Sequence, residues 1–396
     1  MSRHGHLDLD TAERPLVLIW ELTQACALAC DHCRADARPQ RHPDELSTPE
    51  GKRLLEAAGE FGDGQLVVLS GGDPLVRADV AELVSYGTDL GLRMTITPSG
   101  TRSLTRARID ELVDAGLRRM AVSLDGATAD AHDAFRGEEG SFEETIRAIE
   151  DARAAGVPIQ VNTTVCRATV DELPGIRRLL RELGVVMWSV FFLVPIGRGR
   201  LLEPINPETA DAVMSWLHEV NESEPFGLKT TEAPQYRRVS LERQRAERVD
   251  GGKGDDERGR DDGLRRRSGI VAGDGFAFVS HTGEVYPSGF LPKSAGNVRE
   301  QPITDLYRDS PLFRSLRDRD RLEGKCGACP YRTVCGGSRS RANAYFDDPL
   351  ASDPLCPFVP EGYDGPLPWD ESSAPAPSSS SSSSGVPPQF TAPDAD

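Results

Sequence analysis

The chain has 396 residues, of which 38% are hydrophobic and 28% charged, and it carries a formal net charge of −17. At about 150 residues per domain, this length predicts roughly two to three domains with ample core. The acidic excess disfavours a nucleic-acid partner, because such proteins usually show basic patches. No apolar run approaches the roughly 20 residues of a membrane helix and the N-terminus has no apolar signal core, so we expect a cytoplasmic protein with no membrane span.

Arginine far outnumbers lysine among the basic residues. The lysines are Lys52, Lys229, Lys253, Lys293 and Lys325. An acidic surface that prefers Arg to Lys is similar to that of halophilic proteins, in which concentrated salt screens the self-repulsion of the negative charge. An ordinary acidic protein from a GC-rich genome is the alternative.

The first apolar run, residues 16–20, is rich in β-formers and predicts a buried strand. Cys26, Cys30 and Cys33 follow it in a C-x3-C-x2-C spacing, with no fourth cysteine nearby. Three thiolates can hold three irons of a cubane and leave the fourth iron open, whereas a closed zinc site needs one more ligand. The spacing therefore predicts an open, catalytic iron–sulfur cluster, with structural zinc as the alternative.

Strand and helix patterns alternate from there to residue 193. The predicted strands cover 16–20, 66–70, 92–97, 119–124, 159–165 and 185–193. The predicted helices cover 47–60, 80–90, 106–115, 141–154 and 171–183. Strict alternation implies an α/β fold with parallel strands and right-handed crossovers. Six such units fall short of the eight of a closed TIM barrel.

The second predicted strand runs directly into Gly71, Gly72, Asp73 and Pro74. Glycines suit a place where a ligand approaches the backbone closely, because they carry no Cβ. Together with the cysteine triad, this turn resembles the radical S-adenosylmethionine (SAM) enzymes, whose corresponding motif is GGEP. The resemblance implies a partial (β/α)6 TIM barrel in which the triad holds a [4Fe-4S] cluster chelated by SAM.

The same resemblance implies further SAM contacts and an activity. Residues 71–74 would meet the SAM amino group, and the other contacts would be Ser123 and Arg136 at the SAM carboxylate, Asn162 at the ribose and His32 at the adenine. The alternative is that Ser123 belongs to an ordinary strand-end turn and that Arg136 is a surface arginine with no ligand. The implied enzyme is an oxidoreductase or lyase that reductively cleaves SAM to a 5′-deoxyadenosyl radical, which abstracts hydrogen from substrate. A low-potential donor such as ferredoxin or flavodoxin would supply the electron.

A second cysteine group comprises Cys326, Cys329, Cys335 and Cys356. Zinc or an iron–sulfur cluster would both accept four thiolates on spacing alone. Beside a radical SAM barrel, the group and the CGGxRxR turn at 335–341 resemble a SPASM/twitch domain. Ser288 and Ser338 stand where full SPASM domains have further cysteines, so we expect one auxiliary [4Fe-4S] cluster rather than two. The remaining cysteine, Cys166, is interpreted as a small buried hydrophobe.

These features divide the chain into five parts. We predict an N-terminal extension (1–14), the partial barrel (15–235), a flexible polar linker (236–268), the SPASM/twitch-like domain (269–360) and a disordered Ser/Pro tail (361–396). The linker is predicted from the aperiodic polar stretch 243–267, and the tail from its composition. A hairpin is expected over 276–286, with its turn at 282–283.

Several stretches resemble the tetrapyrrole-modifying branch of the family, which includes the alternative haem synthases. They cover 20–23, 132–137, 162–165, 192–195 and 279–285. This implies haem biosynthesis, by oxidative decarboxylation of iron-coproporphyrin or a related modification. A SPASM-type peptide or cofactor-precursor maturase is the alternative, and an iron–sulfur electron carrier or zinc protein is a remote one. Candidate substrate-side residues are Arg198, Glu232, Tyr236 and His281.

Overall fold

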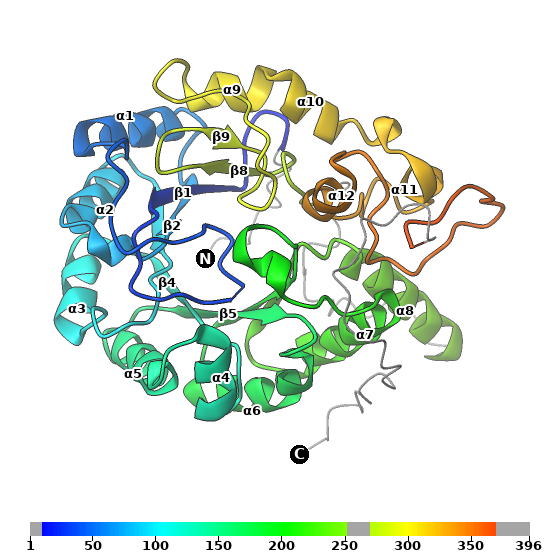
Figure 1. The fold of residues 1–396 in the computed structure, drawn as a ribbon, viewed down its shortest axis with the longest axis horizontal. Coiled ribbons are helices and arrows are strands. Elements are labelled where there is room, and N and C mark those ends of the chain that lie inside the picture. Colours follow the sequence, from blue (N-terminus) through cyan, green and yellow to red (C-terminus); the bar gives the residue numbers. More distant parts are fainter. Residues whose placement is uncertain (1–9, 252–269, 370–396) are drawn as a thin grey trace.

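A curled nine-stranded sheet forms the centre of the computed structural model, which describes residues 10–251 and 270–369 (Figure 1). Its strand order is β7-β6-β5-β4-β3-β2-β1-β8-β9. The first seven strands are parallel and follow the chain: β1 (Val17–Thr23), β2 (Leu66–Gly71), β3 (Arg93–Ile96), β4 (Arg119–Ser123), β5 (Ile159–Val165), β6 (Met187–Phe192) and β7 (Gly227–Thr231). The predicted α/β partial barrel is therefore confirmed.

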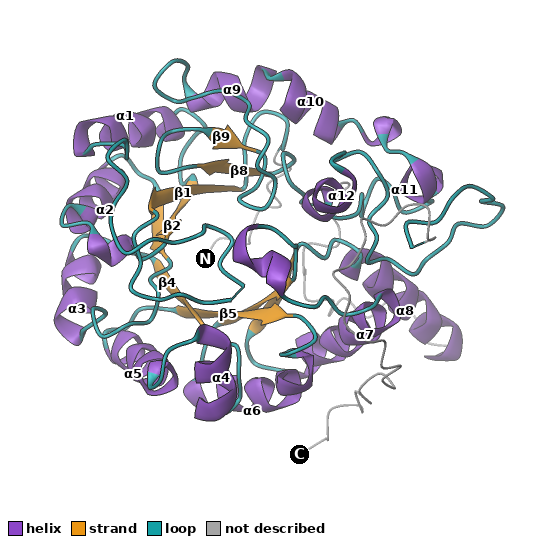
Figure 2. Ribbon diagram, in the orientation of Figure 1, coloured by secondary structure: helices purple, strands orange, loops and turns teal. Residues whose placement is uncertain are grey.

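Helices surround the outer face of this sheet, as Figure 2 shows. Those of the barrel are α1 (Thr48–Gly59), α2 (Val80–Asp89), α3 (Arg106–Asp114), α4 (Ala129–Arg136), α5 (Ser141–Ala154), α6 (Leu173–Leu183), α7 (Pro207–Ser223) and α8 (Tyr236–Gly251). Later in the chain come α9 (Ile303–Asp309), α10 (Pro311–Arg317), α11 (Gly324–Ala328) and α12 (Arg339–Phe346). No helix in the described ranges combines the length and apolar character that crossing a membrane requires.

The alternation of strand residues separates the core from the interior of the barrel. On β5, Ile159, Val161 and Val165 are buried in the hydrophobic core, while Gln160 and Asn162 face a central cavity. Successive side chains of a strand point to opposite faces, so one face of each barrel strand packs on helices and the other lines the cavity. This arrangement places polar side chains where a substrate would lie.

Four elements of the barrel lie outside the predicted ranges: strand β7 and helices α4, α7 and α8. Strand β7 lacks an apolar alternation, and only its pairing with β6 defines it as a strand. Helix α8 occupies the first part of the predicted linker 236–268, which corrects that part of the prediction. Arg238 on α8 forms ion pairs with Asp211 on α7 and with Glu242, so charge pairing helps to hold this strongly charged segment, together with Val239, which is buried in the core. The rest of the predicted linker, from 252 on, lies outside the described residues, as do residues 1–9 and 370–396.

The predicted hairpin consists of β8 (Phe276–Val279) and β9 (Val285–Tyr286), which pair antiparallel. Strand β8 also pairs parallel with β1, from Val17 with Phe276 to Trp20 with Val279. The C-terminal region thus extends the sheet of the barrel on the side opposite β7. The predicted domain boundary at residue 269 therefore falls between strands of one continuous sheet.

Candidate active site

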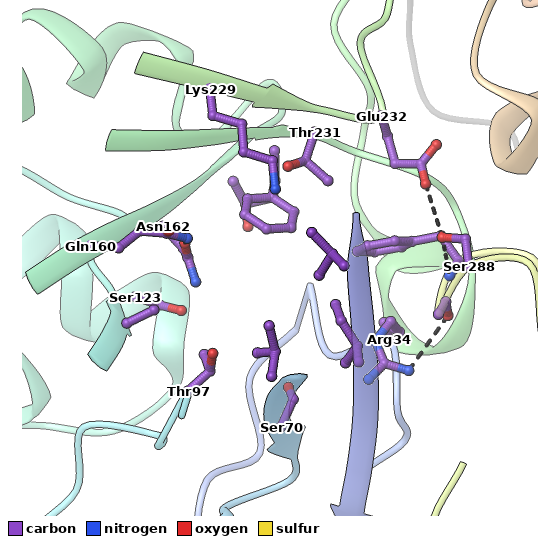
Figure 3. A pocket seen from close by; sticks show the side chains of 18 of the residues that line it. Arg34, Ser70, Thr97, Ser123, Gln160, Asn162, Lys229, Thr231, Glu232 and Ser288 are labelled. Atoms are coloured by element: carbon purple, nitrogen blue, oxygen red, sulfur yellow. Dashed lines mark hydrogen bonds between the residues drawn. The ribbon is translucent and has the colours of Figure 1, made fainter. Parts of the chain in front are cut away.

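A cavity of about 590 Å³ occupies the interior of the curled sheet (Figure 3). Its walls are the inward residues of the barrel strands, and one rim is the loop that follows β1. Cys26, Cys30 and Cys33, the predicted ligands of the first cluster, all line this cavity. Active sites in α/β barrels lie at the carboxyl ends of the strands, so the loop has the position expected of a catalytic one.

The thiol of Cys26 already has polar neighbours that suit a thiolate. The Leu28 backbone N–H donates to Cys26 Sγ over 3.3 Å, and Ser99 Oγ lies 3.3 Å from the same sulfur. Burial raises the pKa values of the Cys26 and Cys30 thiols, so a bound cation would be needed to hold them as thiolates at neutral pH. None of the three cysteines is in a disulfide. Three unbridged thiols, one of them with N–H and O–H partners, fit an iron–sulfur cluster.

A loop from across the barrel braces the cysteine loop. Arg198, in the 3-10 turn Gly197–Leu201 after β6, donates from Nε to the carbonyl oxygen of Cys30 over 3.0 Å. Its Nη1 donates to the Ala37 carbonyl oxygen, and its backbone N–H to that of Cys33. Arg198 was predicted as a substrate-side residue, and it lines the cavity. Its side-chain bonds are directed to the backbone of the cysteine loop.

The turn after β2 packs directly on the same loop. The N–H groups of Gly72 and Asp73 donate to the carbonyl oxygens of Thr23 and Ala25, each over 2.7 Å. A Cβ at Gly72 would lie 2.4 Å from the Ala25 oxygen, so the cysteine loop itself requires glycine here. Gly71 and Gly72 line the cavity, whereas Asp73 and Pro74 do not. The Asp73 carboxylate accepts hydrogen bonds from the Leu75 N–H of its own turn and from the hydroxyl groups of Thr101 and Ser103 in the loop after β3.

The other predicted SAM contacts lie around the cysteine loop on the cavity wall; they are His32, Ser123, Arg136 and Asn162. The His32 ring stacks on Phe135 with ring centroids 4.9 Å apart. Arg136 donates to the Ser99 carbonyl oxygen over 3.1 Å and pairs with buried Asp125 at 3.5 Å, while its Nε has no partner in the described part of the chain. Asn162 accepts a hydrogen bond from Gln160. The wall therefore offers a guanidinium, a hydroxyl and an amide beside the thiols.

The second cysteine group lies in the segment around α11 and α12. The Gly337 N–H donates to Cys335 Sγ and the Asp353 N–H to Cys326 Sγ, each over 3.4 Å. Burial raises the pKa of the Cys356 thiol to about 12 and that of Cys335 further. Cys326, Cys329, Cys335 and Cys356 are all unbridged. Four buried or half-buried thiols, two of them with backbone N–H donors, fit an iron–sulfur cluster without an open corner.

No three His, Cys, Asp or Glu side chains within 10–251 and 270–369 converge closely enough to bind one metal ion. The ligands of a cubane bind different irons, so they need not converge on one point.

Two serines predicted to replace cluster cysteines hold a carboxylate instead. The Glu232 carboxylate accepts hydrogen bonds from Ser338 (2.5 Å) and Ser340 (2.8 Å). It also accepts one from Ser288 (3.1 Å), which Figure 3 shows. Glu232 has a φ of 56°, a left-handed conformation that is uncommon for a residue with a Cβ. Its backbone carbonyl oxygen accepts a hydrogen bond from Arg341 Nη2. The serine hydroxyls are thus used as donors, in keeping with a single auxiliary cluster.

The remaining candidates separate into two sets. Glu232 and Tyr236 line the cavity, but His281 does not. His281 Nδ1 lies 2.8 Å from Glu21, which also pairs with Arg34 at 3.0 Å. Burial would raise the pKa of Glu21, but Arg34 and His281 hold it below its usual value. His281 thus anchors the β8–β9 hairpin to β1. Cys166 is buried beside Phe135 and Leu193.

Sequence reasoning missed several residues of the site: Ser99, Arg93, Arg118, Arg119 and Lys229. Ser99 follows β3 in a run of polar and turn residues, a position at which a strand-end contact could have been suspected. Arg93 and Arg119 open their strands and look like ordinary surface charges in the sequence. Lys229 lies on the unpredicted strand β7, so no pattern indicated that it faces inward (Figure 3).

Comparison with known proteins gives two family matches. The radical SAM superfamily model matches residues 20–180, and the SPASM model, an iron–sulfur cluster-binding domain, matches 271–330. These domains imply a SAM-bound [4Fe-4S] cluster and auxiliary iron–sulfur clusters. The chain resembles an AdoMet-dependent heme synthase from Methanosarcina barkeri, at 41% identity over 87% of this chain and 97% of that protein.

Two further comparisons give lower identities. An Fe-coproporphyrin III synthase from the same organism is 30% identical over 90% of this chain and 91% of that protein. The structure of Streptococcus suis SuiB bound to S-adenosylmethionine has a TM-score of 0.68 at 16% identity, covering 87% of this chain and 78% of that one. At that identity the SuiB likeness describes the fold alone.

Proposed function

This chain belongs to the radical SAM superfamily with a SPASM domain, and from that premise we propose that it oxidatively decarboxylates iron-coproporphyrin in haem biosynthesis. It is a SAM-using enzyme, and its relatives at 39% to 41% identity are named AdoMet-dependent heme synthase. The higher identity to the AdoMet-dependent heme synthase, 41% against 30%, favours that relative's reaction over the one that forms Fe-coproporphyrin III. A cytoplasmic location and a low-potential donor such as ferredoxin or flavodoxin belong to the same proposal.

The charge of the cavity is the observation that carries the substrate assignment. Eight basic side chains line the cavity, namely Arg34, Arg93, Arg118, Arg119, Arg136, Arg198, Lys229 and Arg237, and Glu232 is the sole acidic one among its lining residues. The whole chain, by contrast, has 63 acidic and 46 basic residues. A cationic cavity in an acidic protein favours a substrate with several negative charges. A porphyrin with four carboxylate side chains has that character.

Each side chain near the cysteine loop has a proposed role. Cys26, Cys30 and Cys33 would hold the cluster, and Arg136, Ser123, Asn162 and the backbone at 71–74 would hold SAM. When bound, these cofactors supply a 5′-deoxyadenosyl radical that abstracts hydrogen from the substrate. The close packing of the Gly72 turn on the cysteine loop would help to hold that loop in place for this step.

The second cysteine group has a role that follows from the stoichiometry. Loss of a hydrogen atom and carbon dioxide from one propionate leaves one electron to be accepted elsewhere. Cys326, Cys329, Cys335 and Cys356 would hold an auxiliary cluster suited to accept it. The hydrogen bonds from Ser288 and Ser338 to Glu232 support a single auxiliary cluster in this region.

The test is anaerobic reconstitution with iron and sulfide, followed by incubation with SAM, a strong reductant and iron-coproporphyrin. We expect mass spectrometry to show deoxyadenosine together with loss of carbon dioxide from the porphyrin. Cys30→Ala protein should form neither product. Deoxyadenosine with an untouched porphyrin would contradict the substrate assignment and favour a peptide substrate. No deoxyadenosine from a reconstituted, SAM-binding protein would contradict the reaction itself.

A further inference from the structure

Four cations of the cavity have no anionic partner. Arg93, Arg118, Arg119 and Lys229 line the cavity, and in the described part of the chain their side chains form no hydrogen bond or ion pair. The other basic groups of the wall are engaged: Arg34 pairs with Glu21, and Arg198 binds the cysteine-loop carbonyl oxygens. Arg93, Arg118 and Lys229 are solvent-exposed and Arg119 is half-buried, so these charges are available to an anion that enters the cavity.

Three of these cations also lie close to one another. Burial and the charge of Arg119 lower the pKa of Lys229, and burial and the charge of Arg93 lower that of Arg119. The Lys229 side chain points into the cavity and is exposed there (Figure 3). The positive charges of these three side chains repel one another, and an anion bound in the cavity would reduce that repulsion.

Their positions place this row away from the cysteines. Arg93 and Arg119 are the first residues of β3 and β4, whereas the cysteine loop follows the end of β1. Because the strands are parallel, Arg93 and Arg119 lie toward the opposite end of the barrel. Ile19, Val68 and Leu228 also line the cavity and give its walls apolar surface. The cavity therefore has thiols at one end and cations toward the other, and its walls include apolar side chains.

We propose that Arg93, Arg119 and Lys229 form a carboxylate-binding subsite that holds the acidic side chains of the substrate which are not reacting. This inference rests on the proposed function, since it takes a flat, apolar substrate with several carboxylates as the ligand. Ammonium and guanidinium groups bind carboxylates through charge-assisted hydrogen bonds, and Arg does so with two donors in a fork. Carboxylates anchored at this end leave another carboxylate side chain to face the cysteine loop.

The test is equilibrium binding of iron-coproporphyrin to the reconstituted protein, followed by absorbance, without reductant. Lys229→Met and Arg119→Met keep apolar bulk and remove one charge each. We expect each to weaken binding about tenfold or more, the cost of one hydrogen bond to a charged group. Binding of the tetramethyl ester of the same porphyrin should change little, because its carboxylates are masked. Lys229→Arg should restore most of the affinity for the free acid.

Matched controls are Lys293→Met and Arg106→Met, whose side chains pair with Asp347 and Asp110 outside the cavity. These should bind both porphyrins like the wild type. Equal losses for acid and ester in Lys229→Met and Arg119→Met would show a general packing defect and overturn the subsite. Unchanged affinity for the free acid would also overturn it while leaving the proposed function standing. A wild-type protein that binds neither porphyrin would overturn both.

Discussion

Arg198 donates a hydrogen bond to the carbonyl oxygen of Cys30, a residue 168 positions earlier in the chain. The bond joins the loop after β6 to the loop after β1, which lie on opposite parts of the curled sheet. Together with the bonds to Ala37 and from its own backbone to Cys33, it fixes the backbone that carries the thiols. The cysteine loop has no regular secondary structure of its own, so its geometry depends on this tertiary bracing.

We therefore expect Arg198→Ala to weaken the hold on the first cluster. Removing a charged donor leaves two carbonyl oxygens of the loop without that partner, a cost of about 1.5–3 kcal/mol. Release of iron to a chelator should become about tenfold faster. Arg200→Ala, an exposed arginine of the same turn, is the control and should behave like the wild type. Equal release rates for all three proteins would contradict the bracing role.

The two cysteine groups should lose iron independently. Cys329→Ala is expected to lower the iron content and leave the spectrum of the SAM-bound cluster intact, whereas Cys30→Ala should abolish SAM cleavage and leave the auxiliary iron. Cys166→Ala removes a thiol that packs among Phe135 and Leu193, and it should keep both clusters. Iron analysis with electron paramagnetic resonance distinguishes these cases. Unchanged iron in Cys329→Ala would refute the auxiliary site.

Arg136 is expected to bind the SAM carboxylate through its planar fork. Arg136→Lys keeps the positive charge beside Asp125 but loses the bidentate geometry, so the Kd for SAM should rise about tenfold. Arg102→Lys, at a mostly exposed position, is the matched control. The measurement is anaerobic calorimetric titration of SAM into reconstituted protein. A Kd equal to that of the wild type would leave Arg136 with only its bonds to Asp125 and Ser99.

His132 should make the stability of the protein depend on pH. Burial lowers the pKa of His132 from 6.5 to about 4, and its Nδ1 accepts a hydrogen bond from the Asp125 N–H. Between these two values the unfolded chain binds a proton that the folded chain excludes. Stability is therefore lost as the pH falls from 6.5 toward 4, by up to about 3 kcal/mol from this group.

His132→Asn keeps an acceptor for the Asp125 N–H and cannot titrate. We expect the Tm of the reconstituted variant, measured anaerobically from pH 7.5 to 5.5, to fall less steeply than that of the wild type. His42→Asn, a partly exposed histidine, should retain the wild-type slope. Parallel slopes for the wild type and His132→Asn would show that other groups govern this pH range.

Local signals in the sequence were sufficient for the frame of the barrel. Six strands and five of the helices that pack on them follow from apolar runs, and the fourteen-residue helix α5 has the predicted bounds. Helix α8 and strand β7 were not predicted because contacts with other elements stabilise them. Helix α8 forms charge pairs with α7, and strand β7 forms backbone hydrogen bonds with β6. Neither interaction has a periodic signature in the chain.

The sequence by itself determined the chemistry of this protein, because the spacing of Cys26, Cys30 and Cys33 and the turn at 71–74 are local patterns. Only the tertiary structure decided what surrounds that chemistry. Arg93, Arg119 and Lys229 are dispersed over 137 positions, 93–229, and meet because parallel strands bring alternate residues to one interior. The bond from Arg198 to the cysteine loop likewise exists only when the sheet curls. Contacts between distant segments depend on strand register and sheet curvature, which no local pattern contains.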